Sequence, residues 1–308
     1  MRIGINGSSL IATGAPLSAM ADHLVEAEAA GFSSYWFAQL AVPDTLTAIA
    51  SFGARTNTIE IGTAVVPTWP RHPLMLAAQA LTVQEAIGNR LALGIGLAHK
   101  VSVESTLKVP FVRPAKHMEE YLSVLLPAMR DRKVSFTGDI WSAELEAVTG
   151  VPSAQPPAVM LAAMGPRMLR LAGEHTDGTI LWLSGPKAIG SVIKPALDEA
   201  AEAAGRPAPR IVASVPVCVT KNADDVRGLI GALLAGYNDL PSYRGVMDAE
   251  GAGGPADVSV VGDEDEVRAG LAAFAAAGTT DFAAVEFPTN PDETAATRAL
   301  LTDLATAS

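Results

Sequence analysis

The chain has 308 residues, of which 49% are hydrophobic, so it can bury a core as large as that of a single α/β barrel. Its formal net charge of −11 argues against nucleic acid or an anionic membrane as a general partner, and no apolar run reaches the ~18 residues of a membrane span. The single cysteine, Cys218, excludes an internal disulfide, and Met1 leads directly into a strand-like run without the pattern of a signal peptide, which favours a cytoplasmic protein.

Apolar strand-like runs alternate with alanine-rich helical stretches along the whole chain. Strands are predicted at 2–6, 34–38, 59–66, 91–96, 158–163, 178–183, 211–219 and 282–287. Helices are predicted near 17–30, 44–54, 73–87, 115–130, 167–173, 186–204, 223–238, 264–277 and 292–306. Eight strands separated by helices indicate a parallel sheet, and eight is the number that closes into a TIM barrel. We therefore expect an α/β fold with one barrel domain over residues 1–308.

Two segments exceed the plain barrel pattern. Residues 131–157 resemble a small hairpin followed by a loop. Residues 239–262 lie between the predicted helix at 223–238 and the predicted helix at 264–277. Both contain turn residues and aromatic residues, including Tyr243. Loops at the catalytic face of a barrel commonly shape the substrate pocket, so we treat both segments as insertions.

A pair of glycines ends the strand at 91–96. Gly94 and Gly96 leave bare backbone there, and His99 follows in place of the third glycine of a dinucleotide fingerprint. Because no helix begins at this point, a Rossmann phosphate loop is disfavoured. Two interpretations remain: an ordinary turn at the strand end, or a flat ring packed against it. His99 lies where barrel enzymes place their chemistry, so it is a candidate to contact a cofactor or substrate.

Two further segments follow strand ends. Residues 61–73 contain three prolines and Trp69, which indicates either a plain rigid connector or a wall beside a cofactor with Trp69 overhanging it. Residues 161–178 contain Gly165 and Pro166 at a helix start, followed by Arg167. Free N–H groups at such a start bind anions, although a simple helix cap explains the pattern equally well.

The histidines and the cysteine do not form a recognisable local motif. The spacing of the five histidines fits no zinc pattern, and neither HExxH nor GxSxG occurs. His23 and His175 are predicted to lie on solvated helix faces. Cys218 lies on an apolar strand, so we expect a buried and unreactive thiol.

Taken together, these segments resemble the luciferase-like monooxygenase superfamily, a family of eight-stranded barrels with flavin or deazaflavin cofactors. The resemblance is carried by residues 27–39, 46–73, 76–96 and 165–182. Residues 203–220 and 237–264 are similar to the actinobacterial branch that uses coenzyme F420. The resemblance implies a ring across the carboxyl-terminal mouth of the barrel, in the room left by Gly94, Gly96 and Leu97.

The resemblance also implies particular site residues. It predicts a non-prolyl cis peptide bond between Ala64 and Val65, behind the ring. The residues expected to contact the cofactor are Gln39, Ala64, Val65, Gly96, Leu97, His99, Met164, Gly165, Pro166 and Arg167, of which Met164, Gly165 and Pro166 would hold its phosphate. The basic residues expected near its acidic tail are Arg71, Lys100, Arg113 and Lys116. A homodimer is expected by the same analogy, through the second and third barrel helices.

One departure from the family pattern concerns proton transfer. Sugar-phosphate dehydrogenases of this family have a histidine and a glutamate where Gln39 and Leu97 stand here. Neither residue exchanges a proton near neutral pH, so sugar-phosphate oxidation is disfavoured. Gln39 and His99 remain the candidate catalytic residues, with Gln39 as a hydrogen-bonding group and His99 as a proton carrier.

The expected function is a coenzyme F420-dependent oxidoreductase that transfers a hydride to or from a small, largely apolar molecule. The reaction would be reduction of a C=C, C=N or C=O bond, or oxidation of an alcohol. Trp69, Trp182 and Tyr243 are the predicted substrate contacts. The alternatives are an FMN-dependent monooxygenase and a non-catalytic protein that binds a flavin or deazaflavin. An unrelated barrel lyase or isomerase is disfavoured because no lysine or carboxylate pair lies at the predicted strand ends.

Overall fold

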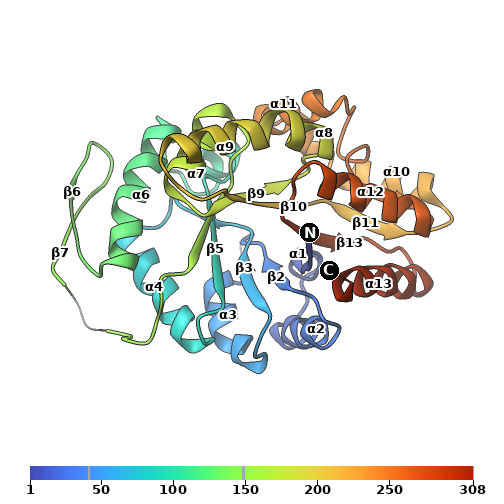
Figure 1. The fold of residues 1–308 in the computed structure, drawn as a ribbon, viewed down its shortest axis with the longest axis horizontal. Coiled ribbons are helices and arrows are strands. Elements are labelled where there is room, and N and C mark those ends of the chain that lie inside the picture. The colour runs from blue at the N-terminus through green and yellow to red at the C-terminus, as the bar shows by residue number, and fades with distance from the viewer. Residues whose placement is uncertain (41, 148–149, 308) are drawn as a thin grey trace.

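The computed structural model describes residues 1–40, 42–147 and 150–307 and contains a closed parallel barrel (Figure 1). Among these residues, the eight strands of the barrel are β1 (Arg2–Asn6), β2 (Ser34–Phe37), β3 (Glu60–Thr63), β5 (Leu91–Gly96), β8 (Ala158–Leu161), β9 (Gly178–Trp182), β10 (Arg210–Ser214) and β13 (Asp281–Glu286). The barrel closes where β1 pairs in parallel with β13, with Ile3 opposite Phe282. The predicted TIM barrel is thus confirmed.

Helices surround the barrel, and most of them match the predicted ranges. They are α2 (Leu17–Ala29), α3 (Thr45–Phe52), α4 (Pro73–Ala86), α6 (Pro114–Arg130), α7 (Pro166–His175), α9 (Lys194–Ala203), α10 (Ala223–Leu233), α12 (Glu264–Ala276) and α13 (Pro291–Thr306). Three short helices add to these: α1 (Ser8–Ala12), α5 (Lys100–Ser105) and α8 (Pro186–Ala188), with the π-helical turn η2 (Ile189–Ile193) joining α8 to α9. The 3-10 turn η1 (Gly53–Arg55) extends α3.

Side chains alternate between the barrel interior and the surrounding helices, as the two-residue period of a strand requires. The interior cluster is Trp36, Ala92, Met160, Ile180, Val212 and Ala283. Trp36 is fully buried, and a Cβ on Gly62 would overlap its ring. One large ring surrounded by small residues therefore fills this layer of the barrel.

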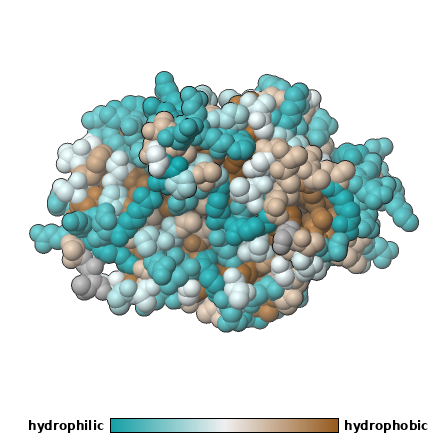
Figure 2. Space-filling view, viewed as in Figure 1, coloured by the Kyte–Doolittle hydropathy of each residue, from teal (hydrophilic) through white to brown (hydrophobic). Residues whose placement is uncertain are grey.

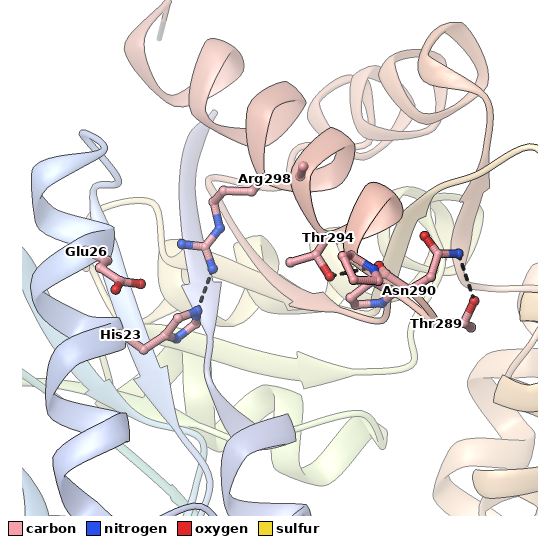
Figure 3. A pocket seen from close by; sticks show the side chains of 9 residues that line it. His23, Glu26, Thr289, Asn290, Thr294 and Arg298 are labelled. Atoms are coloured by element: carbon pink, nitrogen blue, oxygen red, sulfur yellow. Dashed lines mark hydrogen bonds between the residues drawn. The ribbon is translucent and has the colours of Figure 1, made fainter.

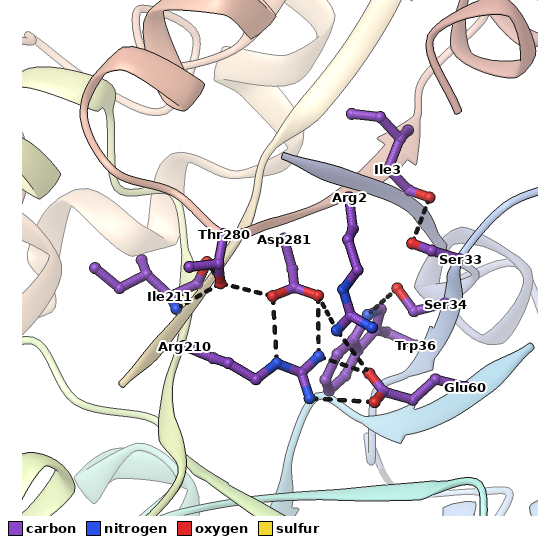
Figure 4. A network of polar contacts seen from close by, with 10 residues as sticks. All are labelled: Arg2, Ile3, Ser33, Ser34, Trp36, Glu60, Arg210, Ile211, Thr280 and Asp281. Atoms are coloured by element: carbon purple, nitrogen blue, oxygen red, sulfur yellow. Dashed lines mark hydrogen bonds and ion pairs between the residues drawn. The ribbon is translucent and has the colours of Figure 1, made fainter. Parts of the chain in front are cut away.

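A charged network closes the amino-terminal end of the barrel (Figure 4). Arg210 donates from Nη2 to Glu60 Oε1 at 2.7 Å and to Asp281 Oδ1 at 2.9 Å, and Arg2 pairs with the same two carboxylates. Burial alone would lower the pKa of Arg210, but the two carboxylates outweigh it and raise that pKa. The first residues of β1, β3, β10 and β13 are thereby tied together at the face opposite the mouth.

Two predicted strands are divided in the structure. The run 211–219 separates into β10 and β11 (Pro216–Val219), because Pro216 has no N–H for the ladder; β11 then pairs with β13 and with β12 (Val260–Gly262). The run 59–66 ends at Thr63 and resumes as β4 (Val66–Pro67), which pairs with β5. The peptide bond between Ala64 and Val65 is cis, as predicted.

The two insertions have different structures. The first contains the predicted hairpin, β6 (Val134–Thr137) and β7 (Ser142–Leu145), which extends away from the barrel beside α6 (Figure 1). Residues 148 and 149 of this insertion lie outside the described part of the chain. The second contains the helix α11 (Pro241–Glu250) and the strand β12, neither of which was predicted. The 3-10 turn η3 (Ala235–Asp239) precedes α11.

The surface carries scattered hydrophobic patches among hydrophilic residues on the face seen in Figure 2. In the described ranges, none of the helices combines the length and the apolar character that crossing a bilayer demands. The same ranges contain no group of three or more His, Cys, Asp or Glu side chains arranged to hold a metal ion.

Candidate functional site

The glycines at the end of β5 are required by the neighbouring strand. A Cβ on Gly94 would overlap the Thr63 carbonyl oxygen, and a Cβ on Gly96 would lie 2.7 Å from Val65 Cγ2. The close approach expected at this strand end is therefore made by β3 and the residues that follow it. A bound ring is not needed to explain either glycine, and the expectation that the pair leaves room for one stays a prediction.

His99 lies in an aromatic cluster at the mouth of the barrel. Its ring is edge-on to Tyr237, with centroids 5.9 Å apart, and to Tyr243 at 5.6 Å. Trp182, at the end of β9, lies 6.4 Å from Tyr237. The tertiary structure thus brings together three predicted site residues, from the segment after β5, from β9 and from the second insertion.

The environment of His99 keeps its side chain neutral. Burial lowers the pKa of His99 from the ordinary 6.5, because an imidazolium loses hydration in this cluster. No hydrogen bond joins His99 to another side chain within the described residues, so its ring nitrogens remain available to a ligand. A neutral imidazole at a barrel mouth can accept a proton from a bound molecule.

The side-chain oxygen of Gln39 already has a hydrogen-bond partner within the protein. Its Oε1 accepts the backbone N–H of Thr45 at 2.9 Å, at the start of α3. The Thr45 hydroxyl donates to the carbonyl oxygen of Ala38 at 2.8 Å, which holds the turn between β2 and α3. Because the oxygen is used in this way, the NH2 group is the part of Gln39 that can serve a ligand, and it serves as a donor.

The start of α7 is open to an anion. Gly165 is its N-cap residue and Pro166 its first helical residue, with no side-chain cap. A Cβ on Gly165 would meet nothing within 4 Å, and Arg167 is exposed. The first N–H groups of a helix have no partner within it, so those of Arg167 and Met168 have no intrahelical hydrogen bond. Met164 is half-buried and packs against both the main core and the aromatic cluster.

The starts of three other helices are capped by side chains of the protein itself. Glu250 Oε2 accepts the N–H of Ala188 at 2.8 Å at the start of α8, and Asp263 caps α12. Asn290 Oδ1 accepts the N–H of Glu293 at 3.0 Å at the start of α13. The starts of α5, α6, α10 and α11, like that of α7, have no side-chain cap. What distinguishes α7 is the open space at Gly165 beside the exposed Arg167, so its role as an anion site stays a prediction.

Three of the four basic residues considered for an acidic tail already have partners. Arg71 pairs with Asp44 and donates to Gln79 Oε1 at 2.7 Å. Arg113 and Lys116 both pair with Asp139 of the β6–β7 turn, at 3.2 and 2.6 Å. Lys100 is exposed and forms no ion pair in the described residues. It is therefore the most accessible of the four cations.

Trp69 packs against other aromatic rings than those of the His99 cluster. Its ring stacks on His117 of α6, with centroids 3.8 Å apart and planes 26° apart, and lies 5.1 Å from Phe111. It forms no ring contact with His99, Tyr237 or Tyr243 in the described structure. Its role as a substrate contact stays a prediction.

A polar cluster at the ends of β1 and β10 escaped the sequence analysis. Asn6 Nδ2 donates to Ser214 Oγ at 3.0 Å, and Asn6 Oδ1 accepts the N–H of Ser8 at 3.1 Å. Both Asn6 and Ser214 are buried. The available signal was the alternation of β1, where Ile3 and Ile5 pack outward and a polar Asn6 must therefore face the barrel interior.

A groove of about 710 Å³ lies outside the barrel, between α2 and the start of α13 (Figure 3). His23 and Arg298 line this groove, and Arg298 forms an ion pair with Glu286. The prediction of a solvated face for His23 is wrong, because its Nδ1 bonds to the buried Tyr35 hydroxyl at 2.6 Å. The His175 side chain is 43% exposed, which confirms the prediction for that residue.

The chain is similar to known proteins over most of its length. The model of the luciferase-like monooxygenase family matches residues 2–281. The 5,10-methylenetetrahydromethanopterin reductase of Archaeoglobus fulgidus is 29% identical over 215 residues, which cover 68% of this chain and 63% of that protein.

Two solved structures share the fold. The coenzyme F420-dependent tetrahydromethanopterin reductase of Methanopyrus kandleri has a TM-score of 0.80 at 20% identity, covering 99% of this chain and 98% of that one. The oxygenating constituent of 3,6-diketocamphane monooxygenase of Pseudomonas putida, in complex with FMN, has a TM-score of 0.75 at 18% identity, covering 99% and 97%. Both neighbours support the barrel architecture.

Proposed function

Since this chain belongs to the luciferase-like monooxygenase family, we propose that it is an oxidoreductase that binds coenzyme F420 and transfers a hydride to or from a small organic substrate. We prefer the deazaflavin to FMN because the Archaeoglobus relative and the Methanopyrus protein are both reductases. The Methanopyrus reductase depends on coenzyme F420. The hydride chemistry belongs to the cofactor, and the barrel positions it and excludes water.

The residues at the mouth suit such a cofactor. The open start of α7, with Arg167 beside it, would hold the phosphate through free N–H groups. Lys100 would meet the acidic tail, and the NH2 group of Gln39 would donate to the ring or to the substrate. The single observation that carries the proposal is the start of α7, where no side chain caps the helix, Gly165 borders open space and Arg167 is exposed.

The substrate would be small, uncharged and largely apolar. Trp182, Tyr237 and Tyr243 supply aromatic surface around His99. His99 would accept a proton during alcohol oxidation, or return it during reduction of a C=O, C=N or C=C bond. Gln39 would stabilise an oxygen of the substrate by donating a hydrogen bond.

Fluorescence titration of the purified protein with F420 and with FMN tests the cofactor assignment. A Gly165→Asp variant places a carboxylate at the helix start and should weaken F420 binding at least ~10-fold through repulsion of the phosphate. Gly165→Ser, which adds a neutral cap, is the matched control and should have a smaller effect. Tight FMN binding without any response to F420 would favour the monooxygenase alternative and overturn the proposal.

A catalytic role needs a separate measurement. Reduced F420 mixed with a panel of ketones, imines and enones, and oxidised F420 with secondary alcohols, should show absorbance changes that depend on the protein. Binding of F420 without turnover of any of these compounds would favour the non-catalytic alternative.

A further inference from the structure

The end of β5 is held by a residue that follows β4. Thr68 donates its backbone N–H to the carbonyl oxygen of Gly96 at 3.0 Å and its hydroxyl to the same oxygen at 3.3 Å. Thr68 is fully buried. Gly96 is the last residue of β5, so this double contact fixes the point from which the chain continues to His99.

The hydroxyl of Thr68 has a second partner. It lies 3.0 Å from Nε2 of His117, which belongs to α6 and is fully buried. A hydroxyl has one hydrogen, and here that hydrogen is donated to Gly96. The Thr68 oxygen must therefore accept, and Nε2 of His117 must carry the proton.

The contact at the other ring nitrogen, Nδ1, requires the same tautomer of His117. Trp141 Nε1 lies 3.3 Å from Nδ1 of His117, and an indole N–H only donates. Nδ1 is therefore unprotonated. The contacts at the two ring nitrogens thus select the same neutral tautomer, with the proton on Nε2. Burial supports this assignment by lowering the pKa of His117 to about 4.

The position of the imidazole is fixed by its neighbours. Trp69 stacks on it at 3.8 Å, and Tyr121 lies nearly parallel to it at 5.7 Å. Trp141 is held in turn by Glu120, whose Oε2 accepts the backbone N–H of Trp141 at 2.9 Å. The ring therefore has little freedom to rotate away from Thr68.

We propose that His117 is a positioning residue, which acts through Thr68 to hold Gly96 and the segment that presents His99 at the mouth. The hydrogen bonds run in one direction, from Trp141 to His117, then to Thr68 and Gly96. This contact chain links the β6–β7 hairpin to the candidate site. The consequence for cofactor binding rests on the proposed function, whereas the consequence for the mobility of residues 97–105 does not.

Two substitutions at Thr68 separate the hydroxyl from the packing. Thr68→Val removes the hydroxyl and keeps the shape, and Thr68→Ser keeps the hydroxyl and removes a methyl group. Hydrogen exchange of the amides in residues 97–105, followed by mass spectrometry of the full chain, should be faster in Thr68→Val by about 5-fold. This is the effect expected on that segment when the hydroxyl's bond to Gly96 is lost together with its bond from His117. In Thr68→Ser the exchange should stay within about 2-fold of the wild type, because the hydrogen bond is kept.

The same two variants should separate in cofactor affinity. Thr68→Val should weaken F420 binding about 5-fold and Thr68→Ser should rescue it, since binding would have to order a loosened segment. Equal acceleration of exchange in both variants would assign the effect to packing and overturn the proposal, as would unchanged exchange in Thr68→Val. If the wild type binds no F420 while exchange still separates the variants, the proposed function fails and the positioning role stands.

A second measurement does not depend on the Thr68 variants. Nitrogen NMR of the wild-type protein should show His117 with its proton on Nε2, and a proton on Nδ1 would overturn the proposal. Trp141→Phe keeps an aromatic ring and removes the donor to Nδ1. It should accelerate exchange of residues 97–105 less than Thr68→Val does, because it acts one contact further away.

Discussion

His99 lies edge-on to Tyr243, with ring centroids 5.6 Å apart, although one residue follows β5 and the other belongs to α11. Tyr243 is 8% exposed, and burial raises the pKa of its hydroxyl. The second insertion therefore covers His99 with an aromatic ring that stays protonated. Together with Tyr237, this ring covers part of the imidazole.

Removal of that ring should change the protonation of His99. In Tyr243→Ala the imidazole is more hydrated, so the pKa of His99 should rise towards its ordinary 6.5. Tyr243→Phe keeps the ring and should leave the pKa unchanged. NMR titration of His99 measures both variants, and an unchanged pKa in Tyr243→Ala would show that Tyr243 does not control its burial.

Activity should depend on pH on the acidic side. If His99 accepts a proton in alcohol oxidation, kcat/KM should fall as the pH drops below the lowered pKa of His99. A profile for His99→Gln that lacks this acidic limb, with F420 affinity close to that of the wild type, would assign the limb to His99. An acidic limb that persists in the variant would exclude it as the base.

Glu28 should contribute to stability in a pH-dependent manner. Burial alone would raise the pKa of Glu28, but its Oε1 accepts N–H groups from Thr58 at 2.6 Å, Ile59 at 3.0 Å and Asn57 at 2.8 Å, which lower it to about 2. Because the folded pKa lies below the ordinary 4.5, the stabilisation is present above pH 4.5 and is lost as the pH falls towards 2.

Urea unfolding of Glu28→Gln tests this dependence. At pH 7 the variant should be less stable by about 1–2 kcal/mol, since a charged acceptor of three N–H groups and the Thr58 hydroxyl is lost, an effect reduced by solvent screening. Its stability should also fall less steeply than that of the wild type between pH 4.5 and 2. Glu26→Gln on the same helix is the control and should leave both quantities near the wild-type values.

The charged network at the closed end of the barrel should be costly to break. Arg210→Met leaves Glu60 and Asp281 without their central partner, and a broken buried pair costs about 3–5 kcal/mol. Arg55→Met removes an exposed ion pair with Asp22 and should cost below about 1 kcal/mol. Similar losses in the two variants, measured by urea unfolding, would contradict a structural role for the network.

Gly94 should tolerate no side chain. In Gly94→Ala the new Cβ overlaps the backbone of Thr63, which cannot move without disturbing β3, so we expect a loss of about 3 kcal/mol or more. Gly165→Ala, where a Cβ meets open space, should change stability by less than about 1 kcal/mol. Thermal unfolding of both variants distinguishes this close approach from a general effect of removing glycine.

Much of the fold and part of the candidate site could be predicted from local patterns in the sequence. The alternation of strands and helices predicted the eight-stranded barrel, and Gly165 with Pro166 predicted an open helix start. Both depend on residues close together in the chain, whose hydrophobic spacing and backbone preferences act locally. The cis bond between Ala64 and Val65 came from resemblance to a family, and the structure contains it.

Contacts between distant segments were decided by the tertiary structure alone. Closure of β1 on β13, the approach of Tyr243 to His99, and the bond of His23 to Tyr35 each depend on how elements are placed across the barrel. The group that approaches Gly96 is likewise Val65 of a neighbouring segment. The glycine in the sequence indicates a close approach but does not identify the approaching residue. A sequence specifies which residues prefer burial or a turn, whereas their partners follow from register and packing across the whole fold.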